Sequence, residues 1–531
     1  MTTIDVSNNL DKFTSQLSAH IWGHRFKDGQ RGPEYVLEFL NVLFGADYSF
    51  SGEHYSRKKS VGLRKFIFEG VKEGSGSKDI LVLEESEREK LVQAVQENNV
   101  QVLKQFLRNL EVVLYNTSGK EADRSWFARS LYPLHESLLY VELRKKGKEL
   151  SFERNFYARG GELYFLMLGL GTEQQSMRRQ FIEQRFQQLL TKNKVIESVV
   201  DRITTVFDES ESKQEHICKL RSSTQDENVP KLPPSAPQEN AQLFECFGAE
   251  LESLLLLDLD IYDFFHLLTS LICFQLTRYM HERATVDSTP LTYFFDCLDG
   301  DNRPISQLAA TSFEQHENLI KTKFETEFEL KAQEVFGTIE KIEAQLPGWK
   351  EEPDLFFEKM GLSQMRSRKK TIERILLRCN NASDVLKNLK NSVRDAVSDQ
   401  LKKHQLNITR VLSRDGGFAT YRRGSAANYR YTISDSFLQM LVFTKVKPGE
   451  KMEYHDFLEA LYKDYGVVIG EHQAKASGEY DKSRLNIRYF QDNEKALRQK
   501  LRHNGLLIEF SDATAMVQNP YDSYSEEVNY A

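Results

Sequence analysis

The chain has 531 residues, 40% hydrophobic and 28% charged, with a formal net charge of −7 at pH 7. This length predicts two to four domains, and the apolar content excludes a disordered chain and a small fold that depends on metal or disulfides. The five cysteines are far apart and form no CxxC pair, which excludes common zinc-site spacings and predicts reduced, mostly buried thiols.

No targeting or membrane segment is predicted. The N-terminal stretch MTTIDVSNNLDKF lacks the basic start and apolar run of a secretory signal. The longest apolar stretches, residues 251–265 and 265–276, include residues that are costly in hydrocarbon. These are Asp258, Asp260, Asp263 and His266. We therefore expect buried helices in a cytoplasmic protein with no membrane partner.

The first part of the chain predicts a mixed, mostly helical domain over residues 1–220. A helix is expected after Gly32-Pro33, where apolar residues recur at helical spacing. The β-like runs 65–71 and 79–85, joined by the glycine- and serine-rich GSGSK, predict a hairpin. In NFYARGGELYFLML, residues 155–168, two glycines predict a close helix approach with an internal Arg–Glu pair, and the alternative is a binding notch.

A change in composition marks the middle of the chain. Residues 221–240 hold four prolines among polar residues and predict a linker. A helical domain over residues 241–412 is expected to follow it. This domain includes a long charged helix over 312–346 and a helical stretch that continues to about residue 412.

The last part of the chain predicts a winged-helix domain over residues 413–521, followed by a polar tail over 522–531. Three helices are expected, over residues 434–446, 454–466 and 492–504. Gly505 suits the end of the last helix, and LLIEF and AMVQN then form a hairpin. Together, these elements predict a mainly α, multi-domain fold with minor β structure.

Positive charge is concentrated between Lys359 and Arg430. This segment holds 17 lysines and arginines but 5 aspartates and glutamates, a balance of +12, so the rest of the chain carries −19. Such asymmetry predicts a surface that faces an anion, and nucleic acid is the commonest large anion. The alternatives are a solvated helix face or a contact with acidic parts of the same protein.

Three groups of residues are candidate DNA contacts. In the last helix, Leu497 and Leu501 point inward, which leaves polar side chains on the opposite face. The candidates are Lys495, Arg498, Gln499 and Arg502 in this helix, Arg422, Arg423 and Arg430 in the preceding peptide, and the stripe Arg366, Lys370, Arg374 and Arg378.

Each group has an alternative interpretation. Winged helices also serve as protein–protein modules. The peptide that carries Arg430 could form a ribbon that packs its tyrosines on the module. The basic stripe could dock on the glutamates of the 312–346 helix.

No catalytic residue, metal site, cofactor or small-molecule substrate is assigned. GVKEGSGSK departs from the spacing of a P-loop, which argues against an ATPase. A metal-dependent nuclease would need clustered carboxylates and a lysine, and the best candidates are Glu69, Asp79, Glu84 and Lys72. Because charged strand ends are usually solvated, the sequence favours a role other than catalysis.

The stretches WGHRFKDGQRGPEYVLEFLNV, NFYARGGELYFLML and LRHNGLLIEFSDATAMVQNPY resemble proteins encoded in bacterial anti-phage defence islands. Such systems include those that sense modified DNA, for example phosphorothioation-dependent restriction. The resemblance implies a component that acts beside separate ATPase, helicase or nuclease subunits. Together with the predicted winged helix and basic segments, it leads us to expect a DNA-binding or adaptor subunit. It carries over no active-site residue, and a protein–protein scaffold or a nuclease remain the alternatives.

Overall fold

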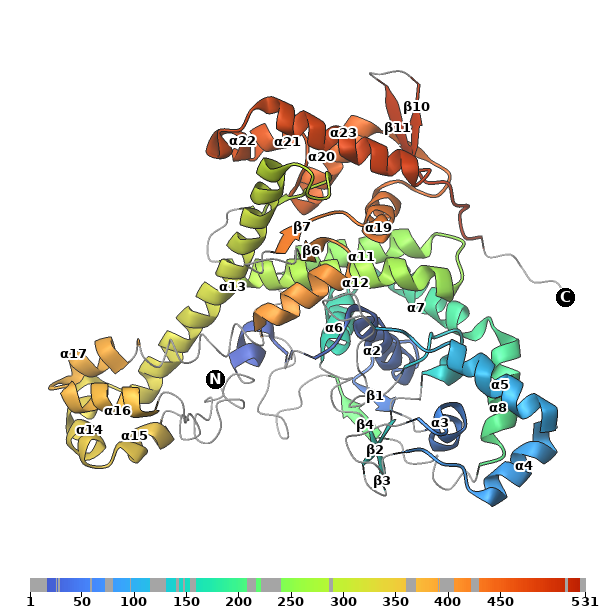
Figure 1. Ribbon diagram of the computed structural model, residues 1–531, viewed down its shortest axis with the longest axis horizontal. Coiled ribbons are helices and arrows are strands. Elements are labelled where there is room, and N and C mark those ends of the chain that lie inside the picture. The colour runs from blue at the N-terminus through green and yellow to red at the C-terminus, as the bar shows by residue number, and fades with distance from the viewer. Residues whose placement is uncertain are drawn as a thin grey trace.

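The computed structural model describes most of the chain (Figure 1). The described residues are 17–24, 26, 29–57, 60–71, 80–95, 97–114, 130–139, 143–146, 149–152, 159–207, 216–220, 240–285, 290–359, 369–389, 391, 405–421, 429–510 and 514–525. Within these ranges the protein is mainly α-helical with small sheets, as predicted. No helix in them is long and apolar enough to cross a membrane. The five cysteines are free, and three of them are buried.

One hydrophobic core joins helices from both sides of residues 221–240. Helices α2 (Gly32–Gly45) and α6 (Gly160–Gly171) pack against each other, and α11 (Ala241–Leu255) and α12 (Ile261–Ala284) cover them. Helix α7 (Ser176–Thr191) packs on α11. Residues 221–240, predicted to link two domains, therefore do not separate two hydrophobic cores. The helices before and after them pack into the same core.

The two glycines at the start of α6 allow the helices α2 and α6 to touch. A Cβ atom on Gly161 would lie 2.5 Å from the backbone nitrogen of Phe39. The next residue, Glu162, is fully buried and accepts hydrogen bonds from Arg159 and from the Tyr55 hydroxyl at 3.0 Å. The predicted close approach with an internal Arg–Glu pair is thus confirmed.

Substituting Gly161 with alanine is expected to lower the free energy of unfolding by about 3 kcal/mol, because the added methyl group meets backbone atoms that cannot give way. The urea midpoint of unfolding measures this loss. Gly348→Ala is the matched control, since a Cβ there meets nothing within 4 Å and helical glycine is unfavourable. Equal midpoints for Gly161→Ala and the native chain would contradict the packing argument.

A smaller unit with its own core lies beside the main one. It comprises α3 (Val61–Phe68), α4 (Glu85–Val95), α5 (Glu97–Asn109) and α8 (Lys194–Thr204). The prediction of a strand over 65–71 is wrong, because Leu63, Phe66 and Ile67 all face this core at helical spacing. Residues 72–79 lie outside the described part of the chain.

Short two-stranded sheets and one helical turn complete this half of the protein. Strand β1 (His54–Arg57) pairs with β4 (His216–Lys219), and β2 (Leu143–Lys146) pairs with β3 (Glu149–Phe152), both antiparallel. The turn η1 spans Glu136–Leu138.

A long helix carries a small lobe away from the body (Figure 1). Helix α13 (Arg303–Phe336) has 34 residues, which corresponds to a length of roughly 50 Å. The lobe at its far end consists of α14 (Ile339–Glu351), α15 (Pro353–Lys359), α16 (Lys369–Arg378), α17 (Ala382–Asp384) and the π-helical turn Val385–Leu389. The single helix predicted over 312–346 is two helices, because the chain adopts a positive φ of 82° at Gly337.

The C-terminal part returns to the body through a helix over residues 405–415 and a ribbon of β6 (Ala419–Tyr421) and β7 (Tyr429–Tyr431). Its helices are α19 (Asp435–Lys445), α20 (Tyr454–Tyr465), α21 (Glu471–Ala476), α22 (Glu479–Ser483) and α23 (Ile487–His503). Strands β8 (Lys451–Glu453), β10 (Leu507–Glu509) and β11 (Ala515–Gln518) form an antiparallel sheet in the order β10-β11-β8. Strand β9 (Val467–Val468) pairs in parallel with β5 (Tyr293–Phe294).

The three predicted C-terminal helices and the hairpin are confirmed as elements. Ser434 caps α19 by accepting a hydrogen bond from the backbone of Phe437. Gly505 follows α23 with a φ of 72°, as a glycine at a helix end does. Helix α23 begins five residues before its predicted start at Asp492, because Asn486 caps it.

Candidate functional site

Helix α23 is fixed to the rest of the protein along one face. Phe490, Leu497 and Leu501 are fully buried on this face. Between them, the Asn493 side chain donates hydrogen bonds to two backbone carbonyls and accepts one from the backbone of Cys297 at 2.8 Å. A buried amide with all of these partners holds the helix in one position.

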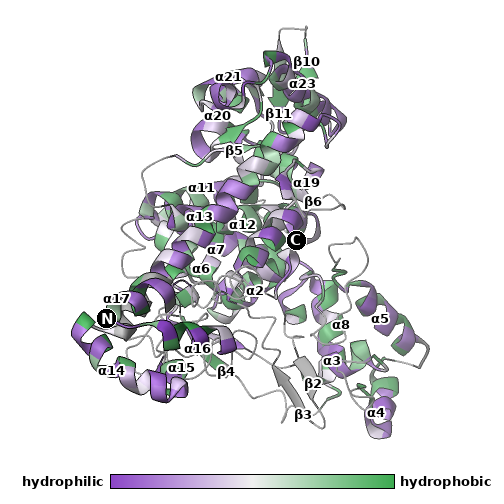
Figure 2. Cartoon of the chain, turned by 60° about the vertical axis from the view of Figure 1, so that its left-hand side comes forward, coloured by the Kyte–Doolittle hydropathy of each residue, from purple (hydrophilic) through white to green (hydrophobic). Residues whose placement is uncertain are grey.

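The opposite face of α23 carries an exposed row of polar side chains. Its members recur every three or four residues: Arg488, Gln491, Lys495, Gln499 and Arg502. The side chain of Lys495 is 72% exposed and that of Arg502 is 63% exposed. Figures 1 and 2 both place α23 at an outer end of the molecule. Arg488 was not among the predicted contacts, because the helix was expected to begin only at Asp492 and in fact begins at Ile487.

Of the predicted DNA contacts on α23, Arg498 is the one most buried against neighbouring residues of the protein. Its side chain is only 25% exposed, and its guanidinium lies 5.3 Å from the ring centre of Tyr454. Glu509 of strand β10 lies 3.8 Å from Arg498 and 3.5 Å from Arg502. Glu494 also interacts electrostatically with Arg498. The charge of Arg498 is therefore engaged within the protein, whereas the side chain of Arg502 remains mostly exposed. The hairpin is not tucked inside, since Phe510 beside its tip is exposed.

The prediction that Arg430 contacts DNA is wrong. Arg430 lies on β7, is buried, and donates a hydrogen bond to Asp296 at 3.0 Å. A buried guanidinium paired with a carboxylate cannot reach a phosphate. The ribbon does bury a tyrosine, but Tyr431 packs against Phe313 of α13 and not on the predicted winged-helix module. Arg422 and Arg423 lie outside the described residues.

The basic stripe lies on α16. Lys370, Arg374 and Arg378 are all exposed, and Arg366 lies outside the described residues. Among the described residues these three cations form no ion pair, so the alternative in which they dock on the glutamates of α13 finds no support there. The stripe and the row on α23 lie at opposite ends of α13 (Figure 1).

The arrangement around Glu69 does not suit a nuclease. Glu69 accepts hydrogen bonds from Lys104 and from Arg88. Partial burial opposes ionisation and is the largest single influence, but the hydrogen bond and charge of Lys104, the backbone N–H of Leu83 and the charge of Arg88 together hold the pKa of Glu69 below its usual value. Asp79 and Lys72 lie outside the described residues, and no three or more His, Cys, Asp or Glu within the described ranges could hold a metal ion.

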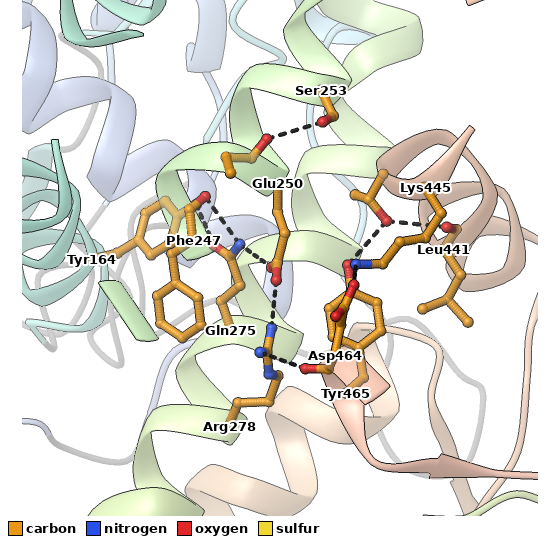
Figure 3. Close-up of polar contacts among 12 residues, drawn as sticks. Tyr164, Phe247, Glu250, Ser253, Gln275, Arg278, Leu441, Lys445, Asp464 and Tyr465 are labelled. Atoms are coloured by element: carbon orange, nitrogen blue, oxygen red, sulfur yellow. Dashed lines mark hydrogen bonds and ion pairs between the residues drawn. The ribbon is translucent and has the colours of Figure 1, made fainter. Parts of the chain in front are cut away.

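A pocket of about 760 Å³ lies where α11 and α12 meet the ends of α19 and α20. Its floor is a chain of polar contacts that starts in the main core (Figure 3). Tyr164 donates to Gln275 at 2.6 Å, and Gln275 donates to Glu250 at 2.6 Å. Arg278 donates to Glu250 at 2.8 Å and to the backbone oxygen of Asp464 at 3.2 Å.

Four of the charged groups that line this pocket form two ion pairs, Arg278 with Glu250 and Lys445 with Asp464. Lys445 donates to the Asp464 carboxylate at 2.6 Å and lies 4.0 Å from the ring centre of Tyr465. Partial burial raises the pKa of the Cys246 thiol at the pocket wall, which disfavours a thiolate nucleophile. The network therefore joins the C-terminal helices to α11 and α12.

Comparisons with protein-family models, with curated proteins and with solved structures found no match to this chain.

Proposed function

We propose that the protein binds double-stranded DNA through the outer face of α23. The observation that carries this proposal is the exposed row from Arg488 to Arg502 on a helix that is anchored along its other face. The row runs from Arg488 to Arg502, 15 residues and so 14 steps of the helix, which is roughly 21 Å along the helix axis. It can follow a groove and place several cations against phosphates.

The elements around α23 support a winged-helix interpretation. Helices α19, α20 and α23 and strands β8, β10 and β11 occur in the chain order that this class of DNA-binding module uses, with β9, α21 and α22 inserted between α20 and α23. In such modules the last helix enters the major groove, and Gln499 on its outer face is suited to reading adenine. The ion pairs of Lys495 and Arg502 are long and exposed, so exchanging a carboxylate for a phosphate costs little.

The wider role that we propose is a DNA-binding or adaptor subunit of a cytoplasmic anti-phage complex. The resemblance to proteins of bacterial defence islands supports this role, with the catalysis supplied by separate subunits. The DNA-binding proposal uses α23 alone, because the α16 stripe lies at the other end of α13.

Removing two charges from the α23 row is expected to weaken DNA binding and its salt dependence. Fluorescence anisotropy with a labelled duplex, repeated over a salt series, gives the slope of log K against log salt. The double variant Lys495→Ala/Arg502→Ala should reduce that slope by about 1.8, since each lost phosphate contact contributes about 0.9.

The control is Lys194→Ala/Arg108→Ala, which removes the same charge from helices α8 and α5. Lys194 matches Lys495 because each is highly exposed and lies near an acidic residue three positions away. An unchanged slope in the α23 variant, or an equal loss in the control, would contradict the proposed interface.

A further inference from the structure

The lobe at the far end of α13 exposes three large aliphatic side chains within the described residues. The three exposed leucines among the described residues all belong to α13 or to this lobe: Leu330 at 51%, Leu355 at 45% and Leu377 at 54%. Ile339 at the start of α14 is also exposed. Apolar side chains gathered on one projecting element mark an interaction surface.

Each of the two outer leucines of the lobe lies beside an excess of charge of one sign, although Glu373 lies four residues before Leu377 and Lys359 four residues after Leu355. Leu377 on α16 lies among Lys370, Arg374 and Arg378, which we call the basic face. Leu355 on α15 lies among Glu351, Glu352 and Glu358, which we call the acidic face. Within the described part of the chain, none of these six charged side chains forms an ion pair.

The acidic and basic faces belong to neighbouring helices of one small unit. Lys369 at the start of α16 binds Asp354 on α15 and lies 5.3 Å from the ring centre of Phe357. Behind both helices, Phe356, Phe357 and Leu376 are fully buried. The two faces therefore belong to helices that share one small core, and each face keeps an excess of one charge.

We infer that this lobe is the contact by which two copies of the chain associate. In a two-fold dimer the acidic face of one copy meets the basic face of its partner, and the reverse contact forms at the same time. Leu355 of one copy then packs near the partner's Leu377, and six unpaired charges of each copy gain opposite charges. A second copy of the chain carries the same two faces at the same separation, so both contacts can form at once.

The composition of the lobe favours a second copy over nucleic acid as the occupant. The carboxylates of the acidic face would repel phosphates, and exposed leucines gain nothing from a phosphate backbone. Figures 1 and 2 both show the lobe projecting at the end of α13, away from α23. Two copies can therefore join through their lobes while the proposed DNA-binding face stays open.

A charge-swap experiment on the full chain tests this contact, with the mass measured by light scattering after size exclusion over a range of concentrations. The native chain is expected to form dimers, and high salt should weaken them. The basic-face variant Arg374→Glu/Arg378→Glu and the acidic-face variant Glu351→Lys/Glu358→Lys should each be monomers, because like charges then meet across the contact.

Mixing the two variants should restore the dimer mass, because each altered face then meets its complement. The control Arg108→Glu/Lys194→Glu, placed on the body, should leave the native dimer unchanged, and circular dichroism checks that every variant is folded. A native chain that stays monomeric, or variants that do not re-associate on mixing, would overturn the inference. A basic-face variant with unchanged mass but weakened DNA binding would assign α16 to nucleic acid instead.

Discussion

Replacing Arg278 with methionine is expected to lower the free energy of unfolding by about 3–5 kcal/mol. The substitution leaves the carboxylate of Glu250, itself buried, without its charged partner at 2.8 Å. It also removes the link to the backbone oxygen of Asp464 at 3.2 Å. Urea unfolding followed by tryptophan fluorescence measures the loss.

The double variant Arg278→Met/Glu250→Gln separates charge from packing. Glutamine keeps a hydrogen-bonding group near Gln275 but carries no charge, so the double variant should recover much of the stability that Arg278→Met loses. A loss of less than about 1 kcal/mol for Arg278→Met would mean that the Arg278–Glu250 pair contributes no more than a surface ion pair. The network would then not be what holds the C-terminal helices to α11 and α12.

Acid is expected to destabilise the protein through two buried histidines. His281 and His316 stack with ring centres 4.5 Å apart, and their Nδ1 atoms lie 3.0 Å from the Tyr293 hydroxyl and 2.7 Å from the Tyr431 hydroxyl. Burial lowers the pKa of His281 well below its usual value and that of His316 to about 3.

The sign of the effect follows from these lowered pKa values. The unfolded chain takes up a proton at each histidine near pH 6.5, whereas the folded chain does not until the pH is far lower. The stability contributed by each neutral histidine is therefore fully present above pH 6.5 and falls by about 1.4 kcal/mol per pH unit below it.

Glu38 acts in the opposite direction over part of this range. Burial raises its pKa to about 7, so the folded chain holds a proton there that the unfolded chain releases above pH 4.5. The histidine contribution is best isolated with His316→Gln, whose stability should fall less steeply between pH 6.5 and 5 than that of the native chain. His472→Gln, at an exposed position, is the control. If the free energy of unfolding of His316→Gln fell with pH in parallel with that of the native chain, His316 would not be a source of the acid sensitivity.

The sequence predicted elements well where local signals agreed. Helix α19 has a serine cap, α20 has a clear apolar face, and α23 ends at a glycine, so the C-terminal elements followed from the chain itself. The strand prediction over residues 65–71 was wrong because a short apolar run is compatible with either a strand or a buried helix. Packing against the surrounding core makes this segment part of helix α3.

The candidate site was less predictable because its contacts join distant parts of the chain. Arg430 meets Asp296, which is 134 residues away, and no pattern around Arg430 indicates that it is buried. The floor of the pocket joins Glu250 and Arg278 to the turn at Asp464 in the same way. By contrast, the outer face of α23 depends on one helix, and helical spacing was sufficient to predict most of it.

Site-specific crosslinking tests the proposed DNA interface most directly. A photo-reactive amino acid at position 499 lies in the middle of the exposed row on α23, and one at position 195 lies exposed on α8. Illumination with a labelled duplex at low salt should give a covalent protein–DNA product at position 499 and none at 195. Crosslinking at 195 but not at 499 would show that DNA contacts another surface and would contradict the account.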